Sequence, residues 1–114
     1  MDVHSMPEYS IVSVSGILGH MCVEEKVVKA ETKGLLIIKL LDRTGQIEVR
    51  SWTRTMDDFS LYRERPILLK RVRVTAYAGI KMLELIDGGG TIVQSEFPHA
   101  ADLSAFWKEP SNAP

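Results

Sequence analysis

The sequence has little of several features that would place it in a large class of proteins. It has one cysteine, Cys22, among 114 residues, which excludes an intramolecular disulfide and favours a reducing, intracellular compartment. No apolar run approaches the roughly 20 residues of a membrane-spanning helix. The N-terminus, Met1-Asp2-Val3-His4-Ser5, lacks the basic and apolar segments of a signal peptide. The length is that of one domain, long enough to bury a core without staples.

Net charge is also nearly absent, at −1, but the charges are unevenly distributed. The segment from Lys39 to Lys81 holds ten basic and five acidic residues, whereas the remainder holds four basic and ten acidic residues. A basic centre between acidic flanks is a hint of polyanion binding. A solvated, salt-bridged surface explains the same distribution equally well.

The pattern along the chain predicts a mainly β domain at 9–97, followed by a short helix at 98–108, between flexible tails at 1–8 and 109–114. Strands are expected, from β-branched runs or alternation, at 9–18, 35–41, 46–52, 67–77 and 80–86, with a short edge strand at 91–96. The segment 23–30 fits a strand end, a loop or a helical turn. Gly16 suggests a bulge or bend in the first strand.

The segment 35–52 is typical of a β-hairpin, because Asp42-Arg43-Thr44-Gly45 forms a turn sequence between its two strands. A short helix is expected at 55–62, where Thr55 and Asp58 resemble a capping box. Its apolar residues Met56, Phe59 and Tyr62 would pack on a core. In the strand at 67–77 the expected buried residues are Leu68, Val72 and Val74, although Lys70 breaks the alternation.

This order of elements predicts a five-stranded OB-fold barrel, which carries a helix between its third and fourth strands. A small SH3-like barrel is the nearest alternative. The helix at 98–108 places Leu103, Phe106 and Trp107 on one face and is too short to be stable alone, so it must dock on this domain or on a partner.

Trp52 is the most informative candidate for a binding residue. Alternation puts Ile47, Val49 and Ser51 on one side of their strand and Trp52 on the other side, with Arg50. Lys39 in the preceding strand could join them. An exposed tryptophan beside cations suits a single-stranded nucleic acid, whose bases stack on the indole while its phosphates meet the cations. A tryptophan that covers the barrel end or packs under the helix is the structural alternative.

The hairpin Leu40-Leu41-Asp42-Arg43-Thr44-Gly45-Gln46-Ile47-Glu48-Val49-Arg50-Ser51-Trp52 resembles the strand 2–strand 3 hairpin of the replication protein A family of OB-folds. Arg71-Val72-Arg73-Val74 is similar to its fourth strand, and Val12-Ser13-Val14-Ser15-Gly16-Ile17-Leu18 to its first. The resemblance covers roughly residues 10–90 and implies that Trp52 stacks on a base. Tyr77 and Met82 are the nearest candidates for a second stacking position.

The resemblance implies a non-catalytic protein that binds single-stranded DNA and acts inside the nucleus in replication, repair or telomere maintenance. The residues expected at the nucleic acid are Lys39, Arg43, Arg50, Trp52, Arg54, Arg71, Arg73, Tyr77, Lys81 and Met82. Small subunits of this family carry a C-terminal helix that assembles a complex of OB-fold subunits, which would assign Leu103, Phe106 and Trp107 to a partner. A protein-interaction OB module with little DNA affinity, and an RNA-binding OB domain, remain as alternatives.

No other motif in the sequence indicates chemistry. Gly88-Gly89-Gly90 is not followed by the residues of a phosphate loop. His20 and Cys22 are too few to form a recognisable metal site, and no cofactor is implied. Asp57 and Asp58 suit the first turn of a helix, and no nucleophile motif is present. The sequence predicts no enzyme.

Overall fold

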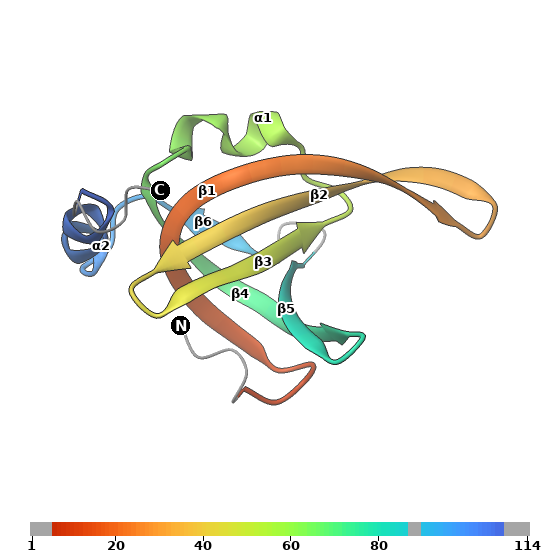
Figure 1. Ribbon diagram of the computed structural model, residues 1–114, viewed down its shortest axis with the longest axis horizontal. Helices are drawn as coiled ribbons and strands as arrows, with labels where there is room; N and C mark the ends of the chain where they lie inside the picture. Colours follow the sequence, from red (N-terminus) through yellow and green to blue (C-terminus); the bar gives the residue numbers. More distant parts are fainter. Residues whose placement is uncertain (1–5, 87–89, 109–114) are drawn as a thin grey trace.

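The computed structural model describes residues 6–86 and 90–108, and Figure 1 shows the arrangement of the elements. Most of this part of the chain is in strands. The elements in chain order are β1 (Ile11–Val28), β2 (Glu31–Asp42), β3 (Gly45–Ser51), α1 (Met56–Phe59), the 3₁₀ turn η2 (Ser60–Tyr62), β4 (Pro66–Tyr77), β5 (Ile80–Leu85), β6 (Ile92–Gln94) and α2 (Ala100–Trp107). The predicted order of elements is confirmed. The ambiguous segment 23–30 proves to be the end of β1 and the turn that follows it.

The strands form a closed ring of five, with the short β6 added beside β4. The order around the sheet is β1-β2-β3-β5-β4, and a β1–β4 pairing closes it. All pairings are antiparallel except β3 with β5. This ring, with α1 between β3 and β4, is the predicted OB-fold barrel. No helix in the described residues is both long and apolar enough to cross a membrane.

The β2–β3 hairpin forms as the sequence predicts. Asp42 pairs with Gly45 across the turn, and Gly45 has a φ of 137°, in the region that favours glycine. The Asp42 side chain accepts a hydrogen bond at 2.8 Å from the backbone N–H of Thr44. This turn sets the register of the two strands, in which Ile38 faces Val49 and Lys39 faces Glu48.

A bulge in β4 changes which residues the strand buries. Arg71 has a φ of 65°, and the β1–β4 register shifts between the Val12 and Val14 pairs at the same place. Such an extra residue reverses the alternation of side chains beyond it. The buried residues are therefore Ile67 and Leu69 before the bulge, and Val72 and Val74 after it. The prediction that Leu68 is buried is wrong for this reason.

Gly16 does not form the bulge that the sequence suggested. The register shifts of β1 lie on either side of it, between Val12 and Val14 and between Leu18 and Met21. A Cβ at Gly16 would lie 2.7 Å from the Leu40 side chain, so this glycine permits β2 to approach closely.

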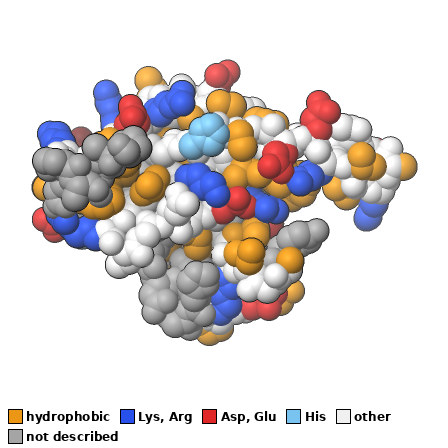
Figure 2. Space-filling view, viewed as in Figure 1, with side chains coloured by type: hydrophobic (Ala, Val, Ile, Leu, Met, Phe, Trp, Pro, Cys, Tyr) orange, Lys and Arg blue, Asp and Glu red, His pale blue; other side chains and the backbone are white. Residues whose placement is uncertain are grey.

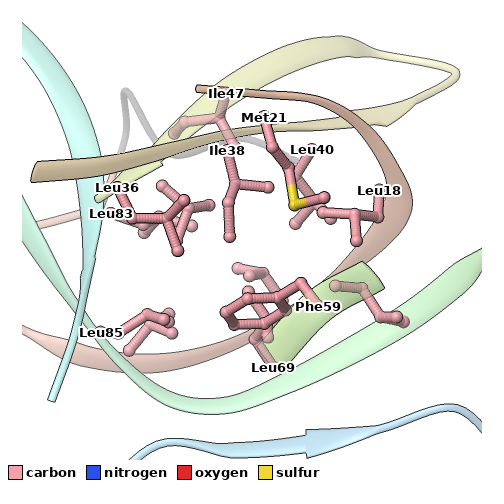
Figure 3. Packing of buried hydrophobic residues seen from close by; sticks show 14 of the residues in the cluster. Leu18, Met21, Leu36, Ile38, Leu40, Ile47, Phe59, Leu69, Leu83 and Leu85 are labelled. Atoms are coloured by element: carbon pink, nitrogen blue, oxygen red, sulfur yellow. The ribbon is translucent and has the colours of Figure 1, made fainter. Parts of the chain in front are cut away.

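The barrel interior is filled by side chains from all five strands and from α1. Figure 3 shows Phe59 of α1 closing the core on one side, against Leu69 and near Leu18. Phe59 is buried as predicted and Tyr62 packs at the edge, whereas Met56 is exposed because it lies on the outer side of the short helix. Met6, which was expected in a flexible tail, packs against this core.

Helix α2 covers a second, smaller cluster on the outside of the barrel. Leu103 and Phe106 are buried against Ile17 of β1, with Leu41, Phe97 and Trp107 packed around them. Figure 1 shows α2 at the end of the molecule opposite to the projecting β1–β2 hairpin. Of the two options that the sequence left open, α2 docks on its own domain.

The ends of β1 and β2 project from the barrel as a two-stranded arm, which we define as residues 23–34. Val28 pairs with Glu31, and the two residues between them, Lys29 and Ala30, have φ values of 51° and 65°. Two successive positive φ values are those of a type I′ turn, which suits the twist of a hairpin. The arm is visible at the right of Figure 1.

Candidate nucleic-acid interface

A groove crosses the outer face of β2 and β3, formed by two adjoining hollows of about 510 and 490 Å³. Both hollows are lined by Arg50 and Met82, so they meet there. We call this the sheet groove. Its other lining residues in the first hollow are Lys39, Gln46, Ile47, Glu48, Ala78, Ile80 and Lys81. In the second hollow they are Lys26, Val27, Val28, Leu35, Trp52, Thr75, Ala76 and Glu84.

Two hairpins wall the sheet groove. The β4–β5 hairpin turns through Ala78 and Gly79, whose φ values of 52° and 81° again fit a type I′ turn. The arm contributes Lys26, Val27 and Val28 from the other side. Because β5 pairs in parallel with β3 at Val49 and Arg50, the β4–β5 hairpin is held beside the centre of the groove.

Trp52 lies at one end of the sheet groove and is 40% exposed. It directly follows β3, whose alternation sends Ser51 inward and Trp52 outward. The buried Ser51 Oγ accepts hydrogen bonds from the backbone N–H groups of Thr53 at 3.3 Å and Arg54 at 3.0 Å, which fixes the turn after the strand. Trp52 also lines a third hollow of about 310 Å³ toward α1. It therefore stands between two hollows, with a large apolar surface in reach of solvent.

An acidic residue occupies the centre of the sheet groove between two of the predicted cations. The Glu48 carboxylate accepts a hydrogen bond from Lys39 Nζ at 3.2 Å and from Arg50 Nε at 2.6 Å, each to a different oxygen. Figure 2 shows acidic and basic side chains interspersed across the middle of this face. The centre of the groove is therefore polar, and one carboxylate offsets part of the charge of its two cations.

The pKa of the Glu48 carboxyl is lowered from its ordinary value of 4.5. Partial burial acts to raise this pKa, but the hydrogen bonds and positive charges of Arg50 and Lys39 outweigh burial. Glu48 is therefore ionised at neutral pH and remains paired with both cations.

The structure brings five of the ten predicted binding residues into the sheet groove: Lys39, Arg50, Trp52, Lys81 and Met82. Lys81 Nζ donates a hydrogen bond to the backbone oxygen of Met6. Met82 of β5 is buried and lines both hollows where they meet. Tyr77 ends β4 opposite Ile80, and its side chain lies outside the described part of the structure.

The remaining predicted cations lie outside the sheet groove. Arg43 sits over the ring of Phe106, 5.6 Å from its centroid, and Arg54 donates to the backbone oxygen of Thr91 at 3.0 Å. Arg71 is exposed at the β4 bulge. Arg73 is paired with Glu84 across β4 and β5 and does not line either hollow of the groove.

Sequence reasoning did not identify the arm residues or Glu48 as part of the site. Val27 is 76% exposed and Ile80 is 63% exposed, one on each wall. The signal for Glu48 was present, since it shares the outward side of its strand with Arg50 and Trp52. No such signal was present for Val27, because the sequence of 23–30 fitted a strand end, a loop or a helical turn equally well.

The three residues predicted to bind a partner are packed within the domain. Leu103 and Phe106 are buried, and Trp107 is half-buried beside them. In this arrangement their apolar face is occupied by the barrel. Among the described residues, no three His, Cys, Asp or Glu side chains converge into a set that could hold a metal ion.

Comparison with known proteins places the chain by its fold. No family model matches the sequence, and no curated protein matches it. Solved structures do match. An OB domain from Thermoplasma acidophilum has a TM-score of 0.59 at 21% identity, over 77% of this chain and 79% of that chain. A replication factor A-related protein from Methanobacterium thermoautotrophicum has a TM-score of 0.61 at 19% identity, over 81% of this chain and 86% of that chain.

A replication protein A heterotrimer bound to single-stranded DNA gives a TM-score of 0.77 at 15% identity. The match covers 98% of this chain but 28% of that chain, so this chain corresponds to a small part of that protein. These neighbours confirm the OB fold and the predicted resemblance to replication protein A at the level of structure.

Proposed function

We propose that this domain is a non-catalytic OB-fold module that binds single-stranded DNA in the sheet groove. One observation carries the proposal: an exposed tryptophan ends a groove that is floored by two strands and walled by two hairpins. Stacking on an aromatic side chain contributes about 1–3 kcal/mol per base and tolerates any base sequence. Trp52 supplies such a surface, and Arg50, Lys39 and Lys81 supply positive charge along the same groove.

The same geometry supports modest affinity and a role within a larger assembly. Lys39 and Arg50 share one carboxylate, so the groove offers less free positive charge than its cations suggest. A structural neighbour is a heterotrimer bound to single-stranded DNA. We therefore propose that this domain acts in DNA metabolism beside other OB-fold subunits, in the nucleus, and that a surface other than the buried face of α2 meets them.

Fluorescence anisotropy with a labelled oligo-dT at low salt tests the proposal. Trp52→Ala should weaken binding by about 5- to 150-fold, the equivalent of 1–3 kcal/mol for one stacked base. Because Trp52 is partly exposed, its removal should leave the fold intact, which circular dichroism verifies. Trp107→Ala is the matched control, since Trp107 ends α2, does not line the sheet groove and should leave binding unchanged. Equal affinity of the parent and Trp52→Ala would contradict the proposal.

RNA is the second candidate ligand, because stacking on Trp52 does not depend on the sugar. Competition between DNA and RNA oligonucleotides of the same sequence distinguishes them, since only RNA carries the 2′-hydroxyl. Stronger competition by RNA would reassign the groove to RNA. A parent protein that binds neither oligonucleotide would favour the protein-interaction alternative, for which the carboxylate of Glu48 between two of the groove's cations is the supporting observation.

A further inference from the structure

The centre of the sheet groove holds a charged trio that the proposed function does not explain. Lys39 and Arg50 each bond one oxygen of Glu48, at 3.2 and 2.6 Å. The Glu48 and Arg50 side chains are 24% and 26% exposed, so the trio is partly shielded from water. A groove that bound phosphates at this point would gain from two free cations and would lose from a carboxylate between them.

The register of the β2–β3 hairpin fixes the trio. Lys39 and Glu48 are direct cross-strand partners, and Arg50 is two residues beyond Glu48 on the same side of β3. Side chains at such positions are neighbours on the sheet surface. The carboxylate therefore holds both cations on the floor of the groove. If a base stacks on Trp52, the bases of the ligand, rather than its phosphate backbone, would lie over this floor.

We propose that Glu48 directs Lys39 and Arg50 to the edges of bases and away from phosphates, an inference that rests on the proposed function. A phosphate at this point would be repelled by the negative charge of Glu48, which is partly shielded from water. An uncharged base would not be repelled. Arg50 keeps its terminal NH₂ groups and Lys39 keeps further N–H donors, because each spends one donor on Glu48. These donors match the carbonyl oxygens of bases, which thymine presents at O2 and O4.

This role makes Glu48 a determinant of salt dependence and base preference. Each phosphate that a cation neutralises on a single strand steepens the plot of log Kobs against log salt by about 0.7. If Glu48 keeps Lys39 and Arg50 away from phosphates, these two cations should contribute nothing to the salt slope of the parent protein. Glu48→Gln keeps the shape and a hydrogen-bonding oxygen but removes the charge, and should release the cations to phosphates.

A double-mutant comparison tests the inference, with binding of oligo-dT and oligo-dC measured over a range of salt. Glu48→Gln should bind oligo-dT several-fold more tightly and with a slope steeper by about 0.7 for each released cation. Lys39→Met in the parent should weaken oligo-dT more than oligo-dC and leave the slope unchanged. Lys39→Met in the Glu48→Gln background should reduce the slope by about 0.7. Thermal unfolding establishes that each variant folds.

Three outcomes would overturn the inference. Lys39→Met could reduce the slope of the parent by about 0.7, which would show that Lys39 already contacts a phosphate. Glu48→Gln could bind with the slope of the parent, which would show that its charge withholds no cation. After either of these two outcomes the proposed function stands, because the oligonucleotide still binds and its binding still depends on Trp52. Absence of binding by the parent and by Glu48→Gln alike would overturn the proposed function and the inference together.

Discussion

The docking of α2 on the barrel leads to a prediction that separates the two options the sequence left open. Leu103 is 2% exposed and packs with Phe106 against Ile17. Leu103→Ala should therefore destabilise the protein, because it removes apolar contact and leaves a cavity. Leu→Ala substitutions in cores cost about 2–5 kcal/mol. The cluster is small and lies near the surface, where neighbours can relax, so we expect the lower half of this range, about 2–3 kcal/mol.

The assay is urea unfolding and thermal unfolding of the full chain. In a domain of this size each kcal/mol lowers Tm by roughly 4 °C, so Leu103→Ala should melt about 10 °C below the parent. Circular dichroism reports on the barrel, and the fluorescence of Trp107, in a Trp52→Phe background, reports on α2. If α2 belongs to the cooperative unit, the two signals should change together.

Leu61→Ala is the matched control, because it is the same substitution at a residue that is 79% exposed. It should change the free energy of unfolding by less than about 0.5 kcal/mol. Equal stability of Leu103→Ala and Leu61→Ala would refute the docking of α2 in solution. The face of Leu103, Phe106 and Trp107 would then be available to a partner, as the resemblance to replication protein A implies.

Two further predictions concern the barrel and the sheet groove. Gly16→Ala should destabilise the protein by about 1–3 kcal/mol, because the new Cβ would lie 2.7 Å from Leu40 Cγ and 2.8 Å from the Leu41 backbone oxygen. Gly34→Ala is the control, because its Cβ would lie 3.3 Å from a single side-chain atom. Equal urea midpoints of the two variants would contradict the reasoning. The pKa of Glu48 is lower in the folded protein than its ordinary 4.5, so its ion pairs stabilise the fold above that pH and are lost as the pH falls through the lower folded value. The difference in free energy of unfolding between the parent and Glu48→Gln should therefore shrink on acidification, and a constant difference from about pH 6 to about pH 3 would show that the pairs contribute nothing.

Local signals were sufficient to predict most of the barrel. The turn at Asp42–Gly45 and the alternation of residues 46–52 depend on neighbouring residues, so their structure and the outward position of Trp52 could be read without tertiary contacts. The buried face of β4 could not be. Lys70 marked a break in the alternation, but only the pairing of β4 with β1 shows that Arg71 forms a bulge and that Ile67 and Leu69 are buried.

The candidate site divides in the same way. Trp52, Arg50 and Lys39 come from one local hairpin, so the sequence brought them together. Arg43 and Arg54 are close to them in the chain but lie outside the groove, because Phe106 and Thr91, both distant in sequence, hold their side chains.

The sequence by itself determined the order of the elements, the turn of the central hairpin and the outward side of its tryptophan, because these follow from alternation and turn chemistry within a few residues. Tertiary structure decided the rest. The parallel pairing of β5 with β3 and the closure of the ring by β1 and β4 brought the β4–β5 hairpin and the arm to the two walls of one groove. Long-range packing also placed α2 on Ile17, 86 positions before Leu103 in the sequence. Contacts at such separations depend on how the whole barrel closes, which no local pattern of residues contains.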